Sequence, residues 1–342
     1  MKIAIIYGVD AATGSHPDPE IRQAVDILIE IKNIQRILNQ QGYETALVRF
    51  DFDVLDRVHE LVEYNPDLIF NFCEVMGDES NFEVQMASVL ELLRLPFTGS
   101  GSCTLALCLN KLLAKMWMNL YGIPTPRHVV IEPGSPIIKA DLKLPLIVKP
   151  VHEDGSLGID EDSVVHDDQA LKSKIFDIHQ RFRQGAIVEE FIDGREFYVS
   201  ILGNDPFEFV QIREFQFLSP KTPHIMSFDA KWKLSSTAYE STPSTEVSNL
   251  ENFVRDEIVR LAVECFKVFK LRDYGTIDFR LGKDKVPYVI DINPNPCINS
   301  ELSAMPQATL QNGLSYEQFI SKFTGVALSR YRSCEGARSR SF

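Results

Sequence analysis

The sequence predicts an α/β protein built of two or three lobes, and three observations lead to this prediction. The chain has 342 residues, which is too long for one simple hydrophobic core. Segments typical of strands and helices alternate near its beginning. The last third instead contains strand-like segments in succession, two of which are separated by only a short polar turn.

The composition is that of an ordinary soluble globular protein, with 44% hydrophobic and 24% charged residues. No apolar run reaches the roughly 18 residues that a bilayer span requires, and residues 2–8 resemble a first strand rather than a secretory signal. The net charge of -13 argues against nucleic-acid binding, because phosphate backbones select basic surfaces. The six cysteines form no C-x-x-C pair, so we expect no zinc or redox motif and a reducing cytoplasm.

The N-terminal segments predict a small parallel sheet. The expected strands are 2–8, 44–50 and 67–73. A helix that ends at Gly42 lies between the first two, because apolar residues recur there at helical spacing. These residues are Ile27, Ile31, Ile34 and Leu38. A further helix is expected over 81–95, and a turn-rich loop over 10–19.

The rest of the chain predicts one helix, then a mixture of strands and helices. A glycine turn at 98–102 leads into a helix that stops before Pro124. Further strands are expected over 145–150, 186–192, 196–202, 208–215, 274–282 and 287–294, with a helix over 249–270. The last two strands are linked by Lys283-Asp284-Lys285, which predicts a hairpin.

The hairpin carries the first candidate site. Residues two apart on a strand share a face, so Asp291 lies beside Asn293, and pairing of the two strands would bring Asp278 to the same patch. Carboxylate and amide oxygens are ligands that Mg²⁺ accepts, especially with substrate phosphates. Residues that merely end strands in solvent are the alternative.

A second candidate is the lysine and glycine-rich loop within 147–159. Lys149 ends an apolar strand, and Gly155, Ser156 and Gly158 follow in a loop that can present backbone N–H groups to a phosphate. The segment is neither a Walker loop nor G-x-G-x-x-G, so an ordinary turn is the alternative.

Acidic residues and isolated lysines complete the candidates. Glu189, Glu190 and Glu196 flank a turn, where they can accept hydrogen bonds from an adenine amino group or from ribose, unless they only form a solvated charged surface. Lys231 lies in a long segment weak in regular structure, of the kind that closes over active sites, and Lys111 begins a helix.

Taken in order, five segments resemble the ATP-grasp superfamily, and within it the D-alanine–D-alanine ligase-like branch. They are "LELLRLPFTGSG…NKLLAK", "IVKPVHEDGSLGI", "VEEFIDGREF", "FDAKWK" and "TIDFRL…YVIDINPNP". The resemblance extends to about Thr324 and implies a three-lobed ATP-grasp fold, with an N-terminal parallel βαβ lobe and two α+β lobes that clamp ATP. The expected lobes are 1–98, 99–185 and 186–328, and residues 329–342 are expected to form a disordered tail.

The resemblance also implies roles for the candidate residues. ATP binding would fall to Lys111, Lys149, Gly155, Ser156, Gly158, Glu189, Glu190, Ile192, Glu196 and Lys231. Asp278, Asp291 and Asn293 match the ligands of Mg²⁺, which Mn²⁺ could replace. The expected catalytic residues are Lys231, Arg280 and Ser156.

Several residues depart from the family pattern. The family's oxyanion arginine is replaced by Thr276, and we expect Arg280 to take over contact with substrate or oxyanion. Cys297 stands where the family has glycine, and we interpret it as a spacer whose backbone N–H can serve the oxyanion. The glutamate that anchors the first amine has no clear counterpart, so Glu20 and Glu74 stay open.

The resemblance therefore implies an ATP- and Mg²⁺-dependent enzyme that joins a carboxylate to an amine through an acylphosphate, with a changed amino-acid pocket. Strict D-alanine–D-alanine ligation and a non-catalytic nucleotide-binding protein are the alternatives. The expected partners are small-molecule carboxylates and amines such as amino acids or short peptides, without nucleic acid or membrane. A cytoplasmic homodimer is also expected.

Overall fold

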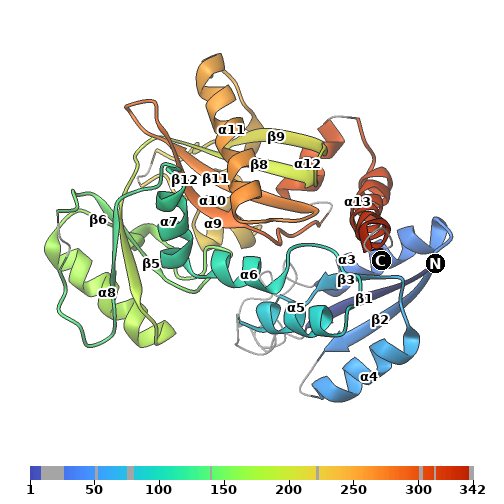
Figure 1. Ribbon diagram of the computed structural model, residues 1–342. Helices are drawn as coiled ribbons and strands as arrows, with labels where there is room; N and C mark the ends of the chain where they lie inside the picture. Colours follow the sequence, from blue (N-terminus) through green and yellow to red (C-terminus); the bar gives the residue numbers. More distant parts are fainter. Residues whose placement is uncertain are drawn as a thin grey trace.

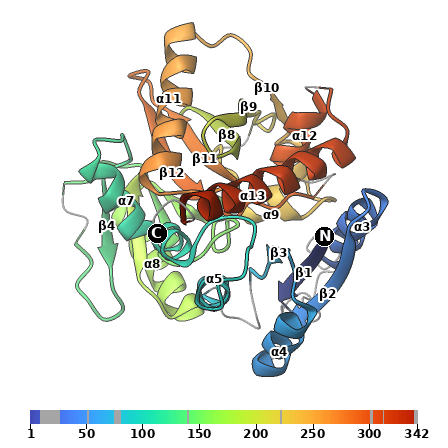
Figure 2. The same cartoon turned by 45° about the vertical axis from the view of Figure 1, so that its right-hand side comes forward.

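The computed structural model describes residues 1–8, 27–50, 53–74, 81–138, 141–220, 223–299, 303–311 and 313–338. Figures 1 and 2 show three lobes, each built on its own sheet. Within the described residues, no helix is both long enough and apolar enough to cross a membrane. The loop predicted over 10–19 lies outside them.

The N-terminal lobe contains the predicted parallel sheet, in the strand order β2-β1-β3. Its strands are β1 (Lys2–Gly8), β2 (Glu44–Phe50) and β3 (Leu68–Phe72), and its helices are α3 (Ile27–Gln40), α4 (Val54–Tyr64) and α5 (Phe82–Leu92). The predicted helical spacing is confirmed, because Ile31, Ile34 and Leu38 of α3 are all buried. Helix α4 was not predicted.

The central lobe contains a four-stranded antiparallel sheet in the order β4-β7-β5-β6. Its elements are β4 (His128–Ile131), β5 (Leu146–Pro150), β6 (Val164–Val165), α8 (Asp168–Phe182) and β7 (Ala186–Glu190). Because β7 pairs with β4 and β5, a boundary at residue 185 cuts this sheet, and the predicted boundary is wrong by one strand.

The C-terminal lobe contains a five-stranded antiparallel sheet in the order β10-β9-β8-β11-β12. Its strands are β8 (Arg195–Gly203), β9 (Phe207–Phe215), β10 (Ser244–Glu246), β11 (Tyr274–Leu281) and β12 (Pro287–Asn293). Its helices are α9 (Phe228–Trp232), α10 (Thr237–Glu240), α11 (Asn252–Val268) and α12 (Ala304–Gln311). The predicted hairpin is confirmed as β11 and β12.

The long helix predicted before Pro124 is two helices, α6 (Ser102–Leu109) and α7 (Lys111–Leu120). The backbone of Asn110 is extended, and its side chain accepts a hydrogen bond from the Leu113 N–H, so it ends one helix and caps the next. Ala114 and Met118 of α7 pack into the same core as α11, so this helix belongs with the C-terminal lobe rather than the central one.

The C-terminal helix α13 (Tyr316–Arg338) covers the N-terminal sheet (Figure 2). Phe319, Ile320 and Phe323 are fully buried in one core with residues of β1 and β3. The prediction of a disordered tail from residue 329 is therefore wrong as far as residue 338, and residues 339–342 lie outside the described part. The buried residues of α13 recur every three or four positions, which is the pattern of a helix with one apolar face.

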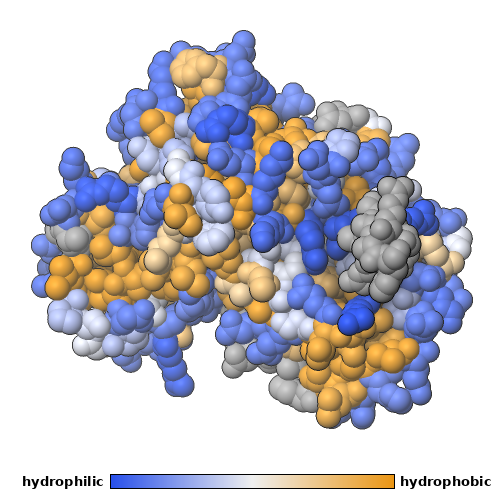
Figure 3. All heavy atoms as spheres, in the orientation of Figure 1, coloured by the Kyte–Doolittle hydropathy of each residue, from blue (hydrophilic) through white to orange (hydrophobic). Residues whose placement is uncertain are grey.

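Hydrophobic residues also gather on the surface of the N-terminal lobe, as Figure 3 shows for one face. Leu55, Leu92 and Leu93 of this lobe are exposed. The homodimer expected from the sequence stays a prediction.

Candidate active site

One large cleft, of about 1970 Å³, lies between the central and C-terminal sheets, and it brings every predicted site residue together. Its lining includes Lys111, Lys149, Gly155, Ser156, Gly158, Glu189, Glu190, Ile192, Glu196, Lys231, Asp278, Arg280, Asp291 and Asn293. These residues come from segments far apart in the chain, so their convergence is a property of the fold. Their individual roles stay predictions.

The β11–β12 hairpin places Asp278 directly opposite Asp291, and Thr276 opposite Asn293. Reduced hydration in the cleft and the Asp291 charge raise the pKa of Asp278 to about 8, against the attraction of Lys231. Two carboxylates at such close range repel each other unless a proton or a cation lies between them. With the amide of Asn293, this donor set fits Mg²⁺.

A buried charge cluster lies beside this pair. The Glu189 carboxylate, 1% exposed, receives Lys149 Nζ at 3.2 Å and Lys115 Nζ at 3.3 Å on the same oxygen, Oε2. Burial would raise the pKa of Glu189, but the two lysines outweigh it and hold this pKa below its ordinary value. The other oxygen, Oε1, is buried without a hydrogen-bond partner among the described residues, so it can accept from a ligand's amino group.

Lys115 contacts the cleft residue Glu189, although it was not among the predicted site residues. Its spacing of four from Lys111 could have indicated this, because residues at i and i+4 lie on one helix face. Lys115 is 1% exposed and also donates to Thr125 Oγ1 at 2.9 Å. Burial lowers the pKa of Lys115 to about 8, opposed by Glu189 and reinforced by Lys149.

Lys111 begins α7 at the edge of the glycine loop. Its Nζ donates to the Glu153 carbonyl and lies 3.8 Å from Asp154 Oδ1. Burial would lower the pKa of Lys111, but Asp291 and Asp154 raise it above its ordinary value. The ammonium group therefore stays charged beside the acidic pair, where a phosphate group would require a cation.

The glycine loop is fastened to the segment that carries Lys231. Ser156 Oγ donates to the Met226 carbonyl at 3.0 Å, and Trp232 Nε1 donates to the Gly155 carbonyl at 2.8 Å. Gly158 has a φ of +79°, and a Cβ there would lie 2.8 Å from Pro150 Cγ, so the loop requires glycine at this position. Both segments line the cleft, and we expect them to form a lid over it.

The far end of the central sheet offers an apolar slot. Ile147, Val164 and Ile225 form a small buried cluster, and Phe191 packs against it. All but Val164 line the cleft. Next to them stand Glu190, which accepts from Arg127 at 3.4 Å, and Glu196. An apolar slot with carboxylates at its rim fits a purine base and its ribose.

Arg280, which the sequence predicts to contact substrate or oxyanion, makes its described contacts within the protein. Its Nη1 lies 3.3 Å from Glu196 Oε2, and its Nη2 donates to the carbonyls of Gly194 and His224. The register shift against β12 leaves Ile290 of β12 unpaired, whereas β11 pairs regularly with β8, so Arg280 lies on the same face as Asp278, two residues further along the strand. Its contacts with Glu196 and Phe191 place Arg280 at the apolar slot.

The opposite end of the cleft is acidic. Glu83 is buried and accepts from Asn295 Nδ2 at 2.8 Å, and Glu74 lines the same end with Cys297. Reduced hydration and the Asp154 charge raise the pKa of Glu74 to about 7, with Lys231 opposing them. Of the two residues left open as the amine anchor, Glu74 thus faces the cleft, while Glu20 lies outside the described residues.

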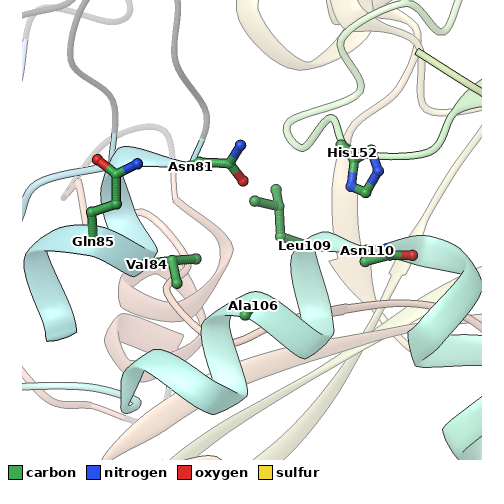
Figure 4. Close-up of a pocket in the computed structure, with 7 residues that line it drawn as sticks. All are labelled: Asn81, Val84, Gln85, Ala106, Leu109, Asn110 and His152. Atoms are coloured by element: carbon green, nitrogen blue, oxygen red, sulfur yellow. The ribbon is translucent and has the colours of Figure 1, made fainter.

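A second, smaller pocket of about 310 Å³ lies where α5 and α6 meet the segment after β5 (Figure 4). It is lined by Asn81, Val84, Gln85, Ala106, Leu109, Asn110 and His152. None of the predicted site residues lines it, so the chemistry is expected in the large cleft.

Known proteins resemble the chain along nearly its whole length. A family model described as D-ala D-ala ligase C-terminus matches residues 123–324, more than half of the chain. The D-alanine–D-alanine ligase of Cupriavidus metallidurans is 31% identical over 327 residues, covering 92% of this chain and 95% of that protein. "Uncharacterized protein y4sG" of Sinorhizobium fredii is also 31% identical, over 299 residues and 86% of both chains.

Solved structures agree on the fold. The D-alanine–D-alanine ligase from Bacillus anthracis complexed with ATP is 20% identical, with a TM-score of 0.71 over 98% of this chain and 99% of that one. Another crystal structure of the Bacillus anthracis ligase gives a TM-score of 0.74 at 21% identity, with the same coverage. The chain belongs to the D-alanine–D-alanine ligase-like family of ATP-grasp proteins.

Proposed function

We propose that this protein is an ATP- and Mg²⁺-dependent ligase that joins a carboxylate to an amine through an acylphosphate. The observation that supports this most is the charge arrangement of the cleft. Lys111, Lys149 and Lys231 line the same cavity as the paired carboxylates Asp278 and Asp291. Phosphoryl transfer depends mainly on positioning and charge neutralisation, and these groups can supply both.

In the proposed mechanism, Lys111, Lys149 and Lys231 bind the phosphates of ATP. Glu189 Oε1 would accept from the adenine amino group, and Asp278, Asp291 and Asn293 would hold the metal. When bound there, Mg²⁺ would neutralise charge that develops on the transferring phosphoryl group. The lid formed by the glycine loop and α9 would exclude water, which otherwise hydrolyses an acylphosphate.

The acid substrate then reacts in two steps. Its carboxylate oxygen attacks the γ-phosphorus of ATP, and ADP leaves. The amine attacks the carbonyl carbon of the acylphosphate, loses a proton and expels phosphate, which leaves an amide. The backbone N–H of Cys297 can stabilise the oxyanion, and Glu74 can hold the amine, because both residues line the acidic end of the cleft.

Genuine D-alanine–D-alanine ligation is the second candidate. Its support is that curated relatives with this name are 30% and 31% identical to the chain. Thr276, in place of the family's arginine, argues for a changed amino-acid pocket instead. A non-catalytic binding protein is disfavoured, because a degenerate site need not keep all these polar groups around one cleft.

The test is to incubate the protein with ATP and Mg²⁺ against pools of D- and L-amino acids and short peptides, following ADP release and new product masses. We expect an amide product and ADP in equal amounts, and neither with the Asp291→Asn variant. Product from D-alanine alone would support strict D-alanine–D-alanine ligation. Bound ATP without turnover in any pool would contradict the proposed reaction and favour a binding protein.

A further inference from the structure

Arg280 lines the cleft although it is only 4% exposed, and its guanidinium group makes an ion pair and hydrogen bonds. It stands directly opposite Glu196 in the pairing of β11 with β8, so the two side chains share one face of the sheet. Its Nη1 lies 3.3 Å from Glu196 Oε2, and two backbone carbonyls bind its Nη2. These contacts fix the guanidinium in one orientation.

The guanidinium is directed toward the apolar slot. Its carbon lies 4.7 Å from the centre of the Phe191 ring, a geometry typical of a cation–π contact. The carboxylate that pairs with Arg280 is that of Glu196 rather than that of a predicted metal ligand. The charge of Arg280 is thus neutralised at the slot and not at the acidic pair.

One polar atom of Arg280 remains available. Its Nε is buried and has no hydrogen-bond partner among the described residues. A buried donor without a partner is costly, and such an atom beside a cleft commonly meets a ligand's acceptor. A nucleoside that fills the slot offers acceptors on its sugar and base.

We propose that Arg280 is a positioning residue of the nucleotide pocket, which holds the Glu196 carboxylate toward the ribose hydroxyl groups and offers its own Nε–H to the nucleoside. The pair Glu196–Arg280 then sets a preference for ribonucleotides over deoxyribonucleotides. This inference rests on the proposed use of ATP, and it replaces the catalytic role that the sequence suggested for Arg280.

The physical reason lies in the burial of Glu196. Burial raises the pKa of this carboxyl group, and Arg280 is the nearest opposing charge, followed by Lys149 and Lys231. Without the arginine, the carboxyl group would rotate and take up a proton more readily. A protonated, loosely held acid is a poorer acceptor for ribose hydroxyl groups than a fixed carboxylate.

The test compares binding of ATP, 2′-deoxy-ATP and 3′-deoxy-ATP by calorimetry in the wild type and in Arg280→Met, Arg280→Lys and Glu196→Gln. We expect the wild type to prefer ATP by roughly tenfold, since a hydrogen bond to a charged group is typically worth that much. Arg280→Met and Glu196→Gln should lose this preference, and Arg280→Lys should keep part of it. The KM for ATP should rise by about tenfold in Arg280→Met, with kcat at saturating ATP changed less than about twofold.

Other results would overturn the inference. A large fall in the kcat of Arg280→Met with the ribose preference intact would show instead that Arg280 acts at the reacting carbonyl. If Arg280→Met does not fold, Glu196→Gln decides, because it leaves the arginine in place. A wild type that binds ATP without any ribose preference contradicts the inference alone, whereas a wild type that does not bind ATP overturns the proposed function as well.

Discussion

Lys115, Glu189 and Lys149 form a buried cluster in which one carboxylate lies between two ammonium groups. Oε2 of Glu189 contacts both lysines, at 3.2 and 3.3 Å. Burying charges is costly, so removing one partner usually destabilises a protein more than the pair itself stabilises it. Such a cost is acceptable at a site where a ligand completes the arrangement, and Glu189 Oε1 still has no partner among the described residues.

The titration of Lys115 should be measurable as a pH dependence of stability. Its pKa is about 8 in the folded protein and 10.5 ordinarily, so the unfolded chain binds more protons between these values. The contribution of Lys115 to the free energy of unfolding should therefore rise with pH across this window, by up to about 3 kcal/mol. Urea unfolding of the wild type and of Lys115→Met at pH 7 to 10 measures it. Parallel pH profiles for the two proteins would contradict the shift.

At the scale of elements, the lid depends on hydrogen bonds between two segments that carry little regular structure. The glycine loop and α9 are joined through Gly155, Ser156, Met226 and Trp232, and Phe228 N–H donates to the Ile159 carbonyl at 3.1 Å. Few apolar side chains stabilise such loops, so individual hydrogen bonds matter for their order. Lys231 takes its position over the cleft from this arrangement.

Trp232→Phe should loosen the lid without harming the fold. The variant keeps an aromatic ring but removes the donor to the Gly155 carbonyl, which is worth about 1 kcal/mol, so the KM for ATP should rise roughly fivefold. Trp117→Phe is the matched control, because Trp117 Nε1 donates to the Val268 carbonyl at 3.0 Å in the C-terminal core. The control should lower Tm and leave KM unchanged. An unchanged KM in Trp232→Phe would show that this bond does not hold the lid.

In addition to its packing in the shared core, helix α13 makes a buried ion pair with the segment that precedes β11. Asp273 is 0% exposed, and both of its oxygens accept from Arg330, at 2.8 Å each. Gly99 N–H donates to the same carboxylate at 2.9 Å. The helix therefore joins the C-terminal sheet to the segment that leaves the N-terminal lobe.

Arg330→Ala should consequently destabilise the protein by about 3 to 5 kcal/mol, because it leaves the Asp273 charge buried and uncompensated. Arg332→Ala changes an exposed arginine of the same helix and should have little effect. Chemical unfolding of the two variants makes the comparison. Equal stability would mean that residues beyond 328 contribute nothing, as a disordered tail would.

At the scale of the whole molecule, the central lobe has a hydrophobic core separate from the core that joins the other two lobes. The N-terminal and C-terminal lobes share one core, which contains Ile5 and Phe70 together with Leu202 and Tyr274. The central lobe has its own core, formed only from residues 129–188. The cleft lies where these two bodies meet, so a ligand that contacts both sides should stabilise their closed arrangement.

Mg²⁺ and ATP together should therefore raise Tm more than ATP with a chelator. A ligand at 100 times its Kd stabilises the folded state by about 2.7 kcal/mol. The double variant Asp278→Asn/Asp291→Asn should lose the part of the Tm increase that depends on the metal, and it should keep part of the increase caused by ATP. Thermal unfolding with each combination measures both. Equal stabilisation with and without the metal would remove these residues from the metal site.

The sequence alone determined those features that depend on local pattern. The short turn between two adjacent strand-like segments predicted the hairpin, and the strand period of two predicted that Asp278, Asp291 and Asn293 meet at one patch. The order of five motifs predicted the family and the candidate site residues, all of which line the cleft. Glycine at 158 likewise follows from a local conformation, with its φ of +79°.

Only the tertiary structure decided which distant groups meet. In the folded protein, Glu189 pairs with Lys115 and Arg280 pairs with Glu196. Strand β7 belongs to the central sheet, and α13 packs against the N-terminal lobe. These contacts join residues far apart in the chain, and the burial that makes each charge require a partner arises only when the lobes assemble. The sequence specifies each side chain, but the packing of the lobes determines which charged group lies next to it.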